Sequence, residues 1–127
     1  MCQEQKFLIC KHCGKIIGII KDAPVPTICC GEPMTVIEAN TVDASYEKHI
    51  PAVTVSGDLI NVVIGETIHP MTEEHHIEWV YLKTKHGGQR KCFKVGDEPK
   101  TVFSVINDKP LAVYAYCNLH GLWVKEI

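Results

Sequence analysis

The amino-acid sequence predicts an all-β protein, in which a small metal-bound knot is followed by a seven-stranded, immunoglobulin-like antiparallel β-sandwich. Three observations predict this fold. Four cysteines in two close pairs occur before residue 31. From about residue 45, short β-rich runs alternate with turn-forming residues, and no stretch has the pattern of an amphipathic helix of ordinary length. We expect two domains, residues 1–36 and 45–127, joined by a connector at 37–44.

Composition narrows the function classes. Of the 127 residues 46% are hydrophobic and 22% are charged, as in a folded protein. The net charge is −2 and no basic block occurs, which argues against nucleic acid as a partner. No apolar run is long enough to span a bilayer and no signal peptide is seen, so we expect a cytoplasmic protein without a membrane partner. Seven cysteines, an odd number, and seven histidines then favour metal binding over disulfides.

The N-terminal knot is predicted from Cys10-x2-Cys13-Gly14 and from the adjacent pair Cys29-Cys30. Two cysteines separated by two residues can direct both sulfurs at one ion, because a tight turn leaves its backbone N–H groups facing inward. Four thiolates make the tetrahedral site that zinc or iron takes, and so short a segment needs a metal to supply folding free energy. Two unrelated pairs of reduced thiols are the alternative, which explains the clustering less well. Spacing alone does not decide between zinc and iron.

The rest of the chain is expected to form strands, because residues of high β propensity occur in short runs between turn formers. The predicted strands are Ala52–Ser56, Leu59–Ile64, Ile77–Thr84, Lys91–Val95, Thr101–Ile106, Leu111–Cys117 and Leu122–Lys125. The turns between them include His86-Gly87-Gly88. Seven short strands in about 80 residues are typical of an immunoglobulin-like sandwich.

A second group of metal-ligating side chains falls near strand ends or in loops of the sandwich. The group comprises His49, His69, His75, Cys117 and His120. Loops at one end of a sandwich cluster in space although they are far apart in sequence. A single histidine on such a surface is more often exposed or held by hydrogen bonds, so the interpretation rests on the set.

Local geometry refines this group. Residues 74–77 are expected to open a strand, in which His75 and His76 would project to opposite faces, and His75 is favoured because its face continues into apolar residues. Residues 47–51 are expected to be extended because they lead into a proline. Cys92 is expected to be a small core residue.

Taken together, these motifs resemble the desulfoferrodoxins, the two-iron class of superoxide reductases, over essentially the whole chain. Cys10-x2-Cys13 with Cys29-Cys30 is similar to the desulforedoxin-like domain of that family, whose rubredoxin-type iron is bound by four thiolates. The catalytic domain of the family is matched by Glu47-Lys48-His49-x-Pro51, His69-Pro70-Met71, Glu74-His75 and Cys117-Asn118-x-His120-Gly121.

The resemblance implies two iron ions per chain. The first would be held by Cys10, Cys13, Cys29 and Cys30, and the catalytic ferrous ion by His49, His69, His75 and His120 equatorially and Cys117 axially. Five protein ligands leave a sixth position open to a small oxidant, and an axial thiolate pushes electron density onto the metal. Calcium is a further candidate cofactor that no motif locates.

The implied activity is the reduction of superoxide, in which superoxide plus one electron and two protons gives hydrogen peroxide and no dioxygen. Lys48 would attract the anion and help to deliver a proton, and Glu47 would occupy the sixth position of the oxidised iron after the product leaves. The expected partners are superoxide, a rubredoxin-like electron donor and a second copy of the chain. The four-cysteine iron is either an electron relay or a structural staple. A non-enzymatic rubredoxin-type electron carrier and a zinc-stapled binding module stay open as alternatives.

Overall fold

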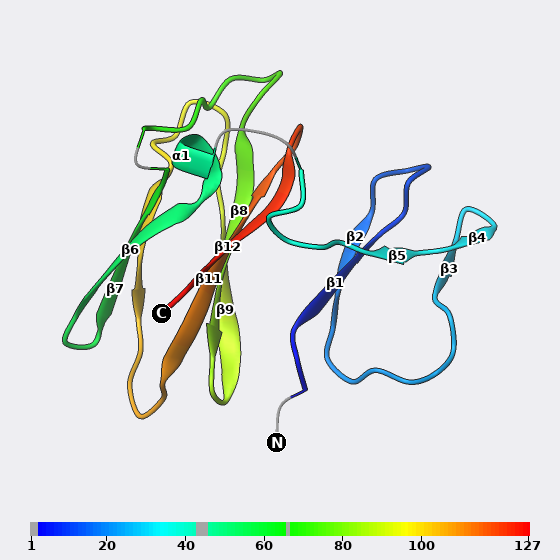
Figure 1. Cartoon of the computed structure of the whole chain (residues 1–127), viewed down its shortest axis with the longest axis horizontal. Helices are drawn as coiled ribbons and strands as arrows, with labels where there is room; N and C mark the ends of the chain where they lie inside the picture. The colour runs from blue at the N-terminus through cyan, green and yellow to red at the C-terminus, as the bar shows by residue number, and fades with distance from the viewer. Residues whose placement is uncertain (1–2, 43–45, 66) are drawn as a thin grey trace. The chain divides into compact units, whose positions relative to one another are not determined.

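The computed structural model describes residues 3–42, 46–65 and 67–127, and it divides into two compact units, Met1–Glu38 and Ala39–Ile127. The predicted domain limits remain a prediction. Strands build both units, and the helix among the described residues is one turn long, α1 (Tyr46–His49) (Figure 1). The predicted all-β class, with a small metal-ligating sheet region before a larger antiparallel sandwich, is confirmed.

Unit 1 consists of two small antiparallel sheets. The first has the order β2-β1-β5, from β1 (Lys6–Ile9), β2 (Ile16–Ile19) and β5 (Thr35–Val36), and the second is the hairpin of β3 (Ile28–Cys29) and β4 (Glu32–Pro33). The buried hydrophobic side chains among its described residues are Phe7 and Cys10. So small a core cannot stabilise the unit by burial alone, which leaves room for a metal to contribute folding free energy.

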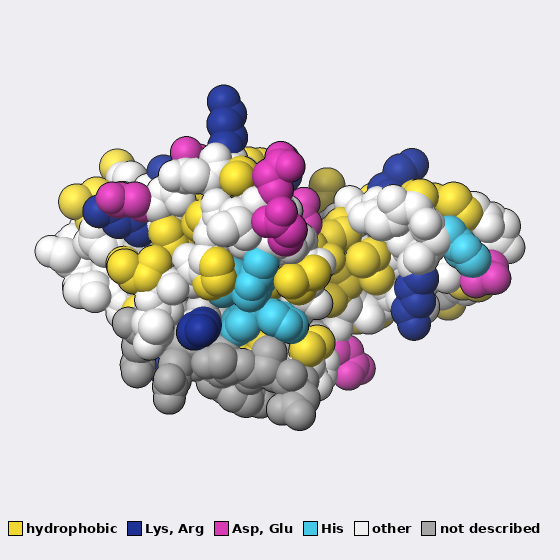
Figure 2. Space-filling view, turned by 90° about the horizontal axis from the view of Figure 1, so that it is seen from above, with side chains coloured by type: hydrophobic (Ala, Val, Ile, Leu, Met, Phe, Trp, Pro, Cys, Tyr) yellow, Lys and Arg dark blue, Asp and Glu magenta, His cyan; other side chains and the backbone are white. Residues whose placement is uncertain are grey.

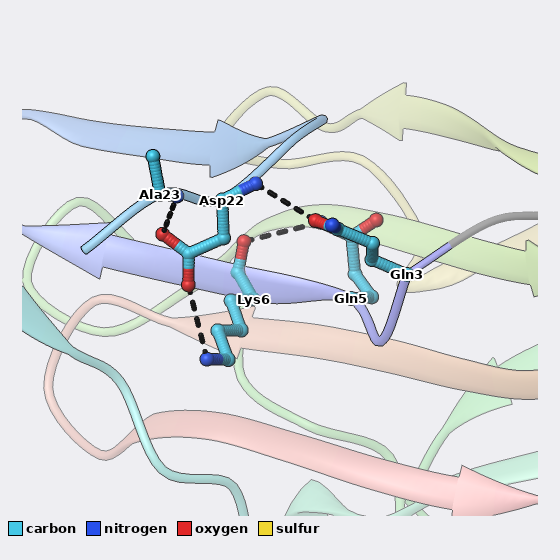
Figure 3. A network of polar contacts seen from close by, with 5 residues as sticks. All are labelled: Gln3, Gln5, Lys6, Asp22 and Ala23. Atoms are coloured by element: carbon cyan, nitrogen blue, oxygen red, sulfur yellow. Dashed lines mark hydrogen bonds and ion pairs between the residues drawn. The ribbon is translucent and has the colours of Figure 1, made fainter.

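A polar network fastens the start of unit 1 to the segment after β2 (Figure 3). Lys6 Nζ lies 3.1 Å from Asp22 Oδ2, and the Asp22 N–H donates to Gln3 Oε1 at 2.7 Å. The hydrogen bond from Lys6 is the main reason that the pKa of Asp22 is below its ordinary value. Because both charged groups are exposed, the ion pair contributes little to the free energy of unfolding. Its main effect is to hold residues 3–6 against Asp22.

Unit 2 is a sandwich of two antiparallel sheets with seven strands among the described residues. One sheet has the order β10-β7-β6, from β6 (Pro51–Ser56), β7 (Leu59–Ile64) and β10 (Lys100–Ser104). The other has the order β12-β11-β8-β9, from β8 (Ile77–Thr84), β9 (Gly87–Cys92), β11 (Pro110–Cys117) and β12 (Gly121–Glu126). Figure 1 shows α1 at the end of the sandwich from which the loop between β7 and β8 also projects.

The core of unit 2 lies between these sheets and extends to one end of the sandwich. Alternate residues of each strand point inward, such as Ile60 and Val62 of β7 and Val113 and Ala115 of β11. Burial of each large aliphatic side chain contributes about 1.5–3 kcal/mol. The inward series of β11 ends at Cys117, which is fully buried, so the strand that builds the core also positions a thiol at its end.

The segment before β6 differs from the sequence prediction. Residues 47–51 were expected to be extended, whereas Tyr46–His49 forms the single turn of α1 and the extended part begins at Pro51. The proline restricts only the residue directly before it, Ile50, and the helix ends before that residue. The prediction was therefore wrong for the residues further upstream.

The second difference is the position of β9. The predicted strand Lys91–Val95 was wrong, because β9 pairs with β8 from Gly87 onward and the turn consists of residues 85 and 86. Gly88, expected in the turn, pairs within the ladder, where a Cβ would clash with the Tyr81 ring. On β9, which is one of the two edge strands of its sheet, Cys92 is exposed and is not the core residue predicted.

Candidate metal centres

The first group of metal ligands lies in unit 1, on two turns. Cys10 follows β1, and the turn from Cys10 to Cys13 is closed by the Gly14 N–H, which donates to the Cys10 carbonyl at 2.8 Å. Cys29 ends β3, and Cys30 and Gly31 form the two-residue turn to β4 with φ values of 51° and 77°. Positive φ at both central positions is the conformation of a type I′ turn, one of the two favoured in hairpins of this length. The left-handed backbone at Cys30 is how two adjacent cysteines replace the usual spaced pair.

The four sulfurs are spaced as a tetrahedral metal site requires. They all lie within 4.8 Å of one another, and the Sγ atoms of Cys13 and Cys29 are 3.7 Å apart. Sulfurs bound tetrahedrally at about 2.3 Å from a metal are about 3.8 Å from each other. All six described cysteines are free thiols, so the cluster is not a pair of disulfides.

The pKa shifts of these thiols also show that the cluster cannot carry four negative charges without a cation. The pKa of Cys10 is lowered to about 6, mainly because the Cys13 N–H donates to its sulfur. The pKa of Cys29 is raised to about 12 by its hydrogen bond with Cys10, and that of Cys30 is raised for the same reason. The ionised form of Cys10 is therefore stabilised, whereas ionisation of Cys29 and Cys30 beside it is disfavoured. Four thiolates at this spacing need a cation to balance their charge, which iron or zinc provides.

A polar contact between His12 and Glu32 spans the outside of the four-cysteine cluster. His12 lies within the Cys10–Cys13 turn, and its Nε2 is 3.1 Å from Glu32 Oε2. Glu32 is the residue that pairs with Cys29 in the β3–β4 hairpin. Both side chains are more than half exposed, so the pair joins the two cysteine turns without adding much stability.

The second group of ligands assembles at one end of the sandwich. His49 ends α1, His69 and His75 lie in the segment between β7 and β8, Cys117 ends β11, and His120 is in the turn before β12. One ligand atom from each of His49, His69, His75 and Cys117 lies within 4.8 Å of all the others. The Nδ1 atom of His120 adjoins this cluster, 3.0 Å from His49 Nε2 and 4.0 Å from Cys117 Sγ. All five predicted residues thus come together.

The four imidazoles form a square. His49 has ring centroids 4.6 Å from His69 and 4.9 Å from His120, and His75 has centroids 4.5 and 4.9 Å from the same two rings. These four neighbouring pairs are nearly perpendicular, with interplanar angles of 78°, 84°, 79° and 85°. The rings of His49 and His75 are 5.9 Å apart and inclined by only 30°, so they lie opposite each other.

The separation between neighbouring nitrogens in this square suits a metal. Nitrogens bound at right angles, each about 2.0–2.1 Å from a metal, are about 3 Å apart. This matches the 3.0 Å between His49 Nε2 and His120 Nδ1. Among the described residues, His69 Nε2 and His75 Nε2 are buried with no hydrogen-bond partner. Buried polar atoms are nearly always paired, so these two nitrogens fit metal ligands better than structural histidines.

The protonation of these rings also fits metal binding. His69 Nδ1 is 2.7 Å from the Pro70 carbonyl, which can only accept, so Nδ1 carries the proton and Nε2 is left basic. Burial lowers the pKa of His69 to about 4 and is also the main reason that the pKa of His75 is lowered. His49 and His69 are buried, whereas His75 and His120 are half-buried. Figure 2 shows histidine side chains gathered on one face.

Cys117 lies on the core side of this group. It is fully buried, and burial raises the pKa of its thiol, while the backbone N–H groups of His120 and Leu119 act in the opposite direction. A register shift between Tyr116 and Cys117 interrupts the pairing of β11 with β8, and such bulges re-aim side chains next to functional sites. Cys117 then pairs with Gly121, whose φ of 76° closes the three-residue turn that carries His120.

The loop that carries His75 differs from its prediction. Residues 74–77 were expected to open a strand, but β8 begins only at Ile77, so the strand-face reason for preferring His75 was wrong. The Thr72 hydroxyl accepts from the His75 N–H and donates to the His75 carbonyl, both at 3.2 Å. The imidazole of His76 faces the Thr72 carbonyl, with Nδ1 2.9 Å away. His75 lies in the metal-ligating cluster and His76 does not.

Two further residues hold these ligands. Sequence reasoning gave no role to Trp123, and it named Asn118 only as part of the motif around Cys117 and His120. Trp123 is fully buried, stacks on His49 with ring centroids 4.8 Å apart, and donates from Nε1 to the His120 carbonyl at 3.1 Å. Asn118 bonds to both neighbours of His75. The sequence shows that both residues lie close to Cys117 and His120 along the chain, but it does not show which distant residues they contact.

The two predicted polar residues of the site lie on α1. Lys48 is exposed, and its charge is one of those that lower the pKa of His75, after burial and the neighbouring His120 and His49. Glu47 belongs to α1, but its side chain lies outside the part of the chain that the structure describes. Figure 2 shows a basic side chain beside the histidines.

Comparison with known proteins places these two donor sets in a family. Residues 41–126 match the family model described as desulfoferrodoxin. A desulfoferrodoxin from Syntrophotalea carbinolica is 39% identical over 126 residues, which cover 99% of each chain. The chain belongs to the desulfoferrodoxin family. The prediction of this family from the sequence motifs is confirmed.

Superoxide reductases are similar in both sequence and structure. The structure of a superoxide reductase from Treponema pallidum has a TM-score of 0.81 and 38% identity, and the match covers 97% of this chain and 99% of that one. A superoxide reductase from Pyrococcus horikoshii is 36% identical over 103 residues, which cover 67% of this chain and 90% of its own length.

The donor atoms limit which metals fit. Four thiolates, and imidazoles with one thiolate, are consistent with two iron sites in a member of this family. Calcium prefers oxygen ligands, so neither donor set supports the calcium ion that was considered. No helix in the described ranges is both long and apolar enough to cross a membrane.

Proposed function

We propose that the chain reduces superoxide to hydrogen peroxide at the histidine–cysteine centre, consuming one electron and two protons and releasing no dioxygen. As a member of the desulfoferrodoxin family with near full-length relatives, the chain is a superoxide reductase. The observation that carries the assignment to this centre is the square of four imidazoles with a buried thiol beside it.

The proposed ligands divide the work of holding iron. In the catalytic centre His49, His69, His75 and His120 supply neutral nitrogens and Cys117 supplies a thiolate. These five residues would hold a ferrous ion, whose chemistry would be the one-electron reduction of superoxide. The Cys117 thiolate would donate electron density to the ion and so favour that reduction. The buried position of Cys117 keeps water and competing reactants away from the sulfur.

The residues of α1 are proposed to handle the substrate. Superoxide is an anion, and the exposed Lys48 beside His49 provides a positive charge that raises its local concentration and its rate of arrival. The Lys48 ammonium also has a proton to donate towards peroxide. We propose that the Glu47 carboxylate would take the sixth coordination position of the iron after hydrogen peroxide has left.

The four-cysteine group is proposed to hold the second iron. Its thiols Cys10, Cys13, Cys29 and Cys30 are the donor set of a rubredoxin-type iron. Two of these residues, Cys13 and Cys30, are exposed, which would let an external donor approach closely. This exposure favours an electron relay over a purely structural staple. It also makes a rubredoxin-type electron carrier the second candidate function.

The remaining partners follow from the same chemistry. Reduction without dioxygen production needs an external reductant, for which we propose a rubredoxin-like protein. We further propose that the chain forms a homodimer and acts in a reducing compartment, the cytoplasm, where free thiols such as the six described here persist.

Product analysis together with metal analysis tests this function. Iron-loaded protein given superoxide and a reductant should form hydrogen peroxide in a 1:1 ratio with superoxide consumed, without dioxygen, and should contain two irons per chain. Dioxygen formation would indicate dismutation instead. A protein that carries two zinc ions and does not react with superoxide would overturn the proposal, and one that only exchanges electrons through the four-cysteine iron would establish the carrier.

A further inference from the structure

Asn118 joins the turn between β11 and β12 to the loop that precedes β8. Its Oδ1 accepts from the His76 N–H at 2.9 Å, and its Nδ2 donates to the Glu74 carbonyl at 3.0 Å. Its backbone N–H donates to the His76 carbonyl at 3.1 Å. Three hydrogen bonds from one residue therefore hold the two residues that flank His75.

The place of Asn118 in the chain connects this loop to other ligands. Asn118 follows Cys117 directly and precedes His120 by two residues. The loop and the turn are far apart in sequence, since His76 and Asn118 are separated by 42 positions. A displacement of the turn would therefore move His75, and a displacement of the loop that carries His75 would move the turn.

We propose that Asn118 is a positioning residue that fixes His75 relative to Cys117, and that it thereby sets how tightly the centre retains its metal and how the thiolate bonds to it. This inference rests on the metal centre of the proposed function. Asn118 is a ligand of neither the substrate nor the metal. It acts through the backbone on either side of His75.

The hydrogen bonds of Thr72 do not replace this connection. The Thr72 hydroxyl bonds to the backbone of His75, and the Thr72 carbonyl faces His76, but all three residues belong to the same loop. These bonds shape the loop internally. The Asn118 side chain, which is half-buried, ties the loop to the strand pair that carries Cys117.

Such a connection matters because no hydrogen bond orients the ligand atom. Among the described residues, His75 Nε2 is buried without a hydrogen-bond partner. Its position therefore depends on the ring contacts with His69 and His120 and on the backbone at residues 74–76. Residues that orient metal ligands typically change metal affinity by about 10–100-fold when they are mutated. We expect an effect of that size for Asn118.

Two variants of the iron-loaded full chain test the proposal. Asn118→Ala removes both side-chain hydrogen bonds and should release iron from the histidine–cysteine centre to a chelator about 10–100-fold faster than the wild type. Asn118→Asp keeps the acceptor for the His76 N–H but turns a second acceptor towards the Glu74 carbonyl, so it should also release iron faster than the wild type. If Asn118→Ala does not fold, the Asp variant still gives the comparison.

The spectroscopic readout separates positioning from general stability. The thiolate-to-iron absorption of the oxidised centre is obtained as the difference from Cys117→Ser, and it should shift in Asn118→Ala. The matched control is Asp108→Ala, which removes the acceptor for the Thr84 hydroxyl at 2.6 Å and for the His86 N–H at 3.1 Å, at the opposite end of β8 and β11. The control should unfold more easily and keep the wild-type spectrum and release rate.

The outcomes distinguish this inference from the proposed function. Wild-type release and absorption in Asn118→Ala, or the same changes in Asp108→Ala, would overturn the positioning role while superoxide reduction stands. Failure of the wild-type protein to bind metal through Cys117 and the histidines would overturn both. Faster release with a shifted band in the Asn118 variants alone establishes the role.

Discussion

Replacement of Trp123 by phenylalanine reduces the ring contact with one proposed ligand, His49, and removes the hydrogen bond to another, His120. The indole is fully buried, lies over the His49 ring at a centroid distance of 4.8 Å and an angle of 29°, and donates to the His120 carbonyl at 3.1 Å. Phenylalanine keeps an aromatic face for His49 but has no N–H for His120. The two histidines are neighbours in the square, so both effects act on the same side of the centre.

The loss of stability can be worked out from these contacts. Loss of the hydrogen bond costs about 1–3 kcal/mol, depending on how well the His120 carbonyl finds another donor. Complete removal of a buried Trp ring costs about 3–5 kcal/mol, and phenylalanine retains most of that burial, so the cavity costs roughly 1–2 kcal/mol. We therefore expect Trp123→Phe to lower the free energy of unfolding by about 2–5 kcal/mol, a large part of the stability of a domain of this size.

The assay combines urea unfolding, followed by far-UV circular dichroism, with iron release to a chelator. Trp123→Phe should shift the unfolding midpoint and also release iron about tenfold faster, because His49 and His120 lose their support. The matched control is Trp79→Phe, since Trp79 is also buried but stacks on Tyr116, with centroids 5.6 Å apart. The control should lose stability without a change in iron release.

Two results would refute this reasoning. A Trp123→Phe protein within about 0.5 kcal/mol of the wild type, the range of ordinary surface substitutions, would show that neither contact matters. Equal acceleration of iron release in Trp79→Phe would show that any loss of core packing loosens the centre. The specific connection from Trp123 to the ligands would then be lost.

Three further predictions concern charge, ligation and pH. Lys48→Ala should slow the second-order reaction with superoxide by about tenfold or more and flatten its ionic-strength dependence, and an unchanged rate would remove Lys48 from the mechanism. Cys117→Ser should abolish superoxide reduction while the absorption of the four-cysteine iron persists; a variant that keeps full activity would show that Cys117 is not a ligand. The hydrogen bond from Thr84 is the main reason that the pKa of Asp108 is lowered, so this carboxylate stabilises the fold above its ordinary value of about 3.9 and loses that contribution as the pH falls through the lowered pKa. Asp108→Asn should accordingly lose less stability than the wild type on acidification in that range, and parallel pH curves in urea unfolding would contradict this.

The candidate ligands could be predicted from the sequence because few residue types bind iron or zinc and their local spacing is restrictive. Cys10 and Cys13 lie on one turn, and Cys117 and His120 bracket another, so each pair can be recognised locally. The strands of the sandwich could be predicted for a related reason. Alternating apolar residues such as those of β8 and β11 must bury one face, whatever lies opposite.

Local patterns were insufficient where tertiary contacts decide the conformation. The turn of α1 is too short to have a helical period, and the position of β9 depends on Gly88 fitting under the Tyr81 ring. His75 was chosen over His76 for a reason that did not hold, because hydrogen bonds to Thr72 and Asn118 keep this segment out of β8.

The sequence by itself thus determined the metal chemistry of this protein, since thiols and imidazoles in these numbers and spacings have few other uses. Only the tertiary structure decided the geometry of the second centre. The square of imidazoles draws on residues from His49 to His120, and their order around it depends on which loops the sandwich brings to the same end. The contacts of Trp123 and Asn118 with the ligand-bearing segments were likewise decided only by the tertiary structure. Hydrogen bonds and ring contacts between distant segments exist only once the strands have paired.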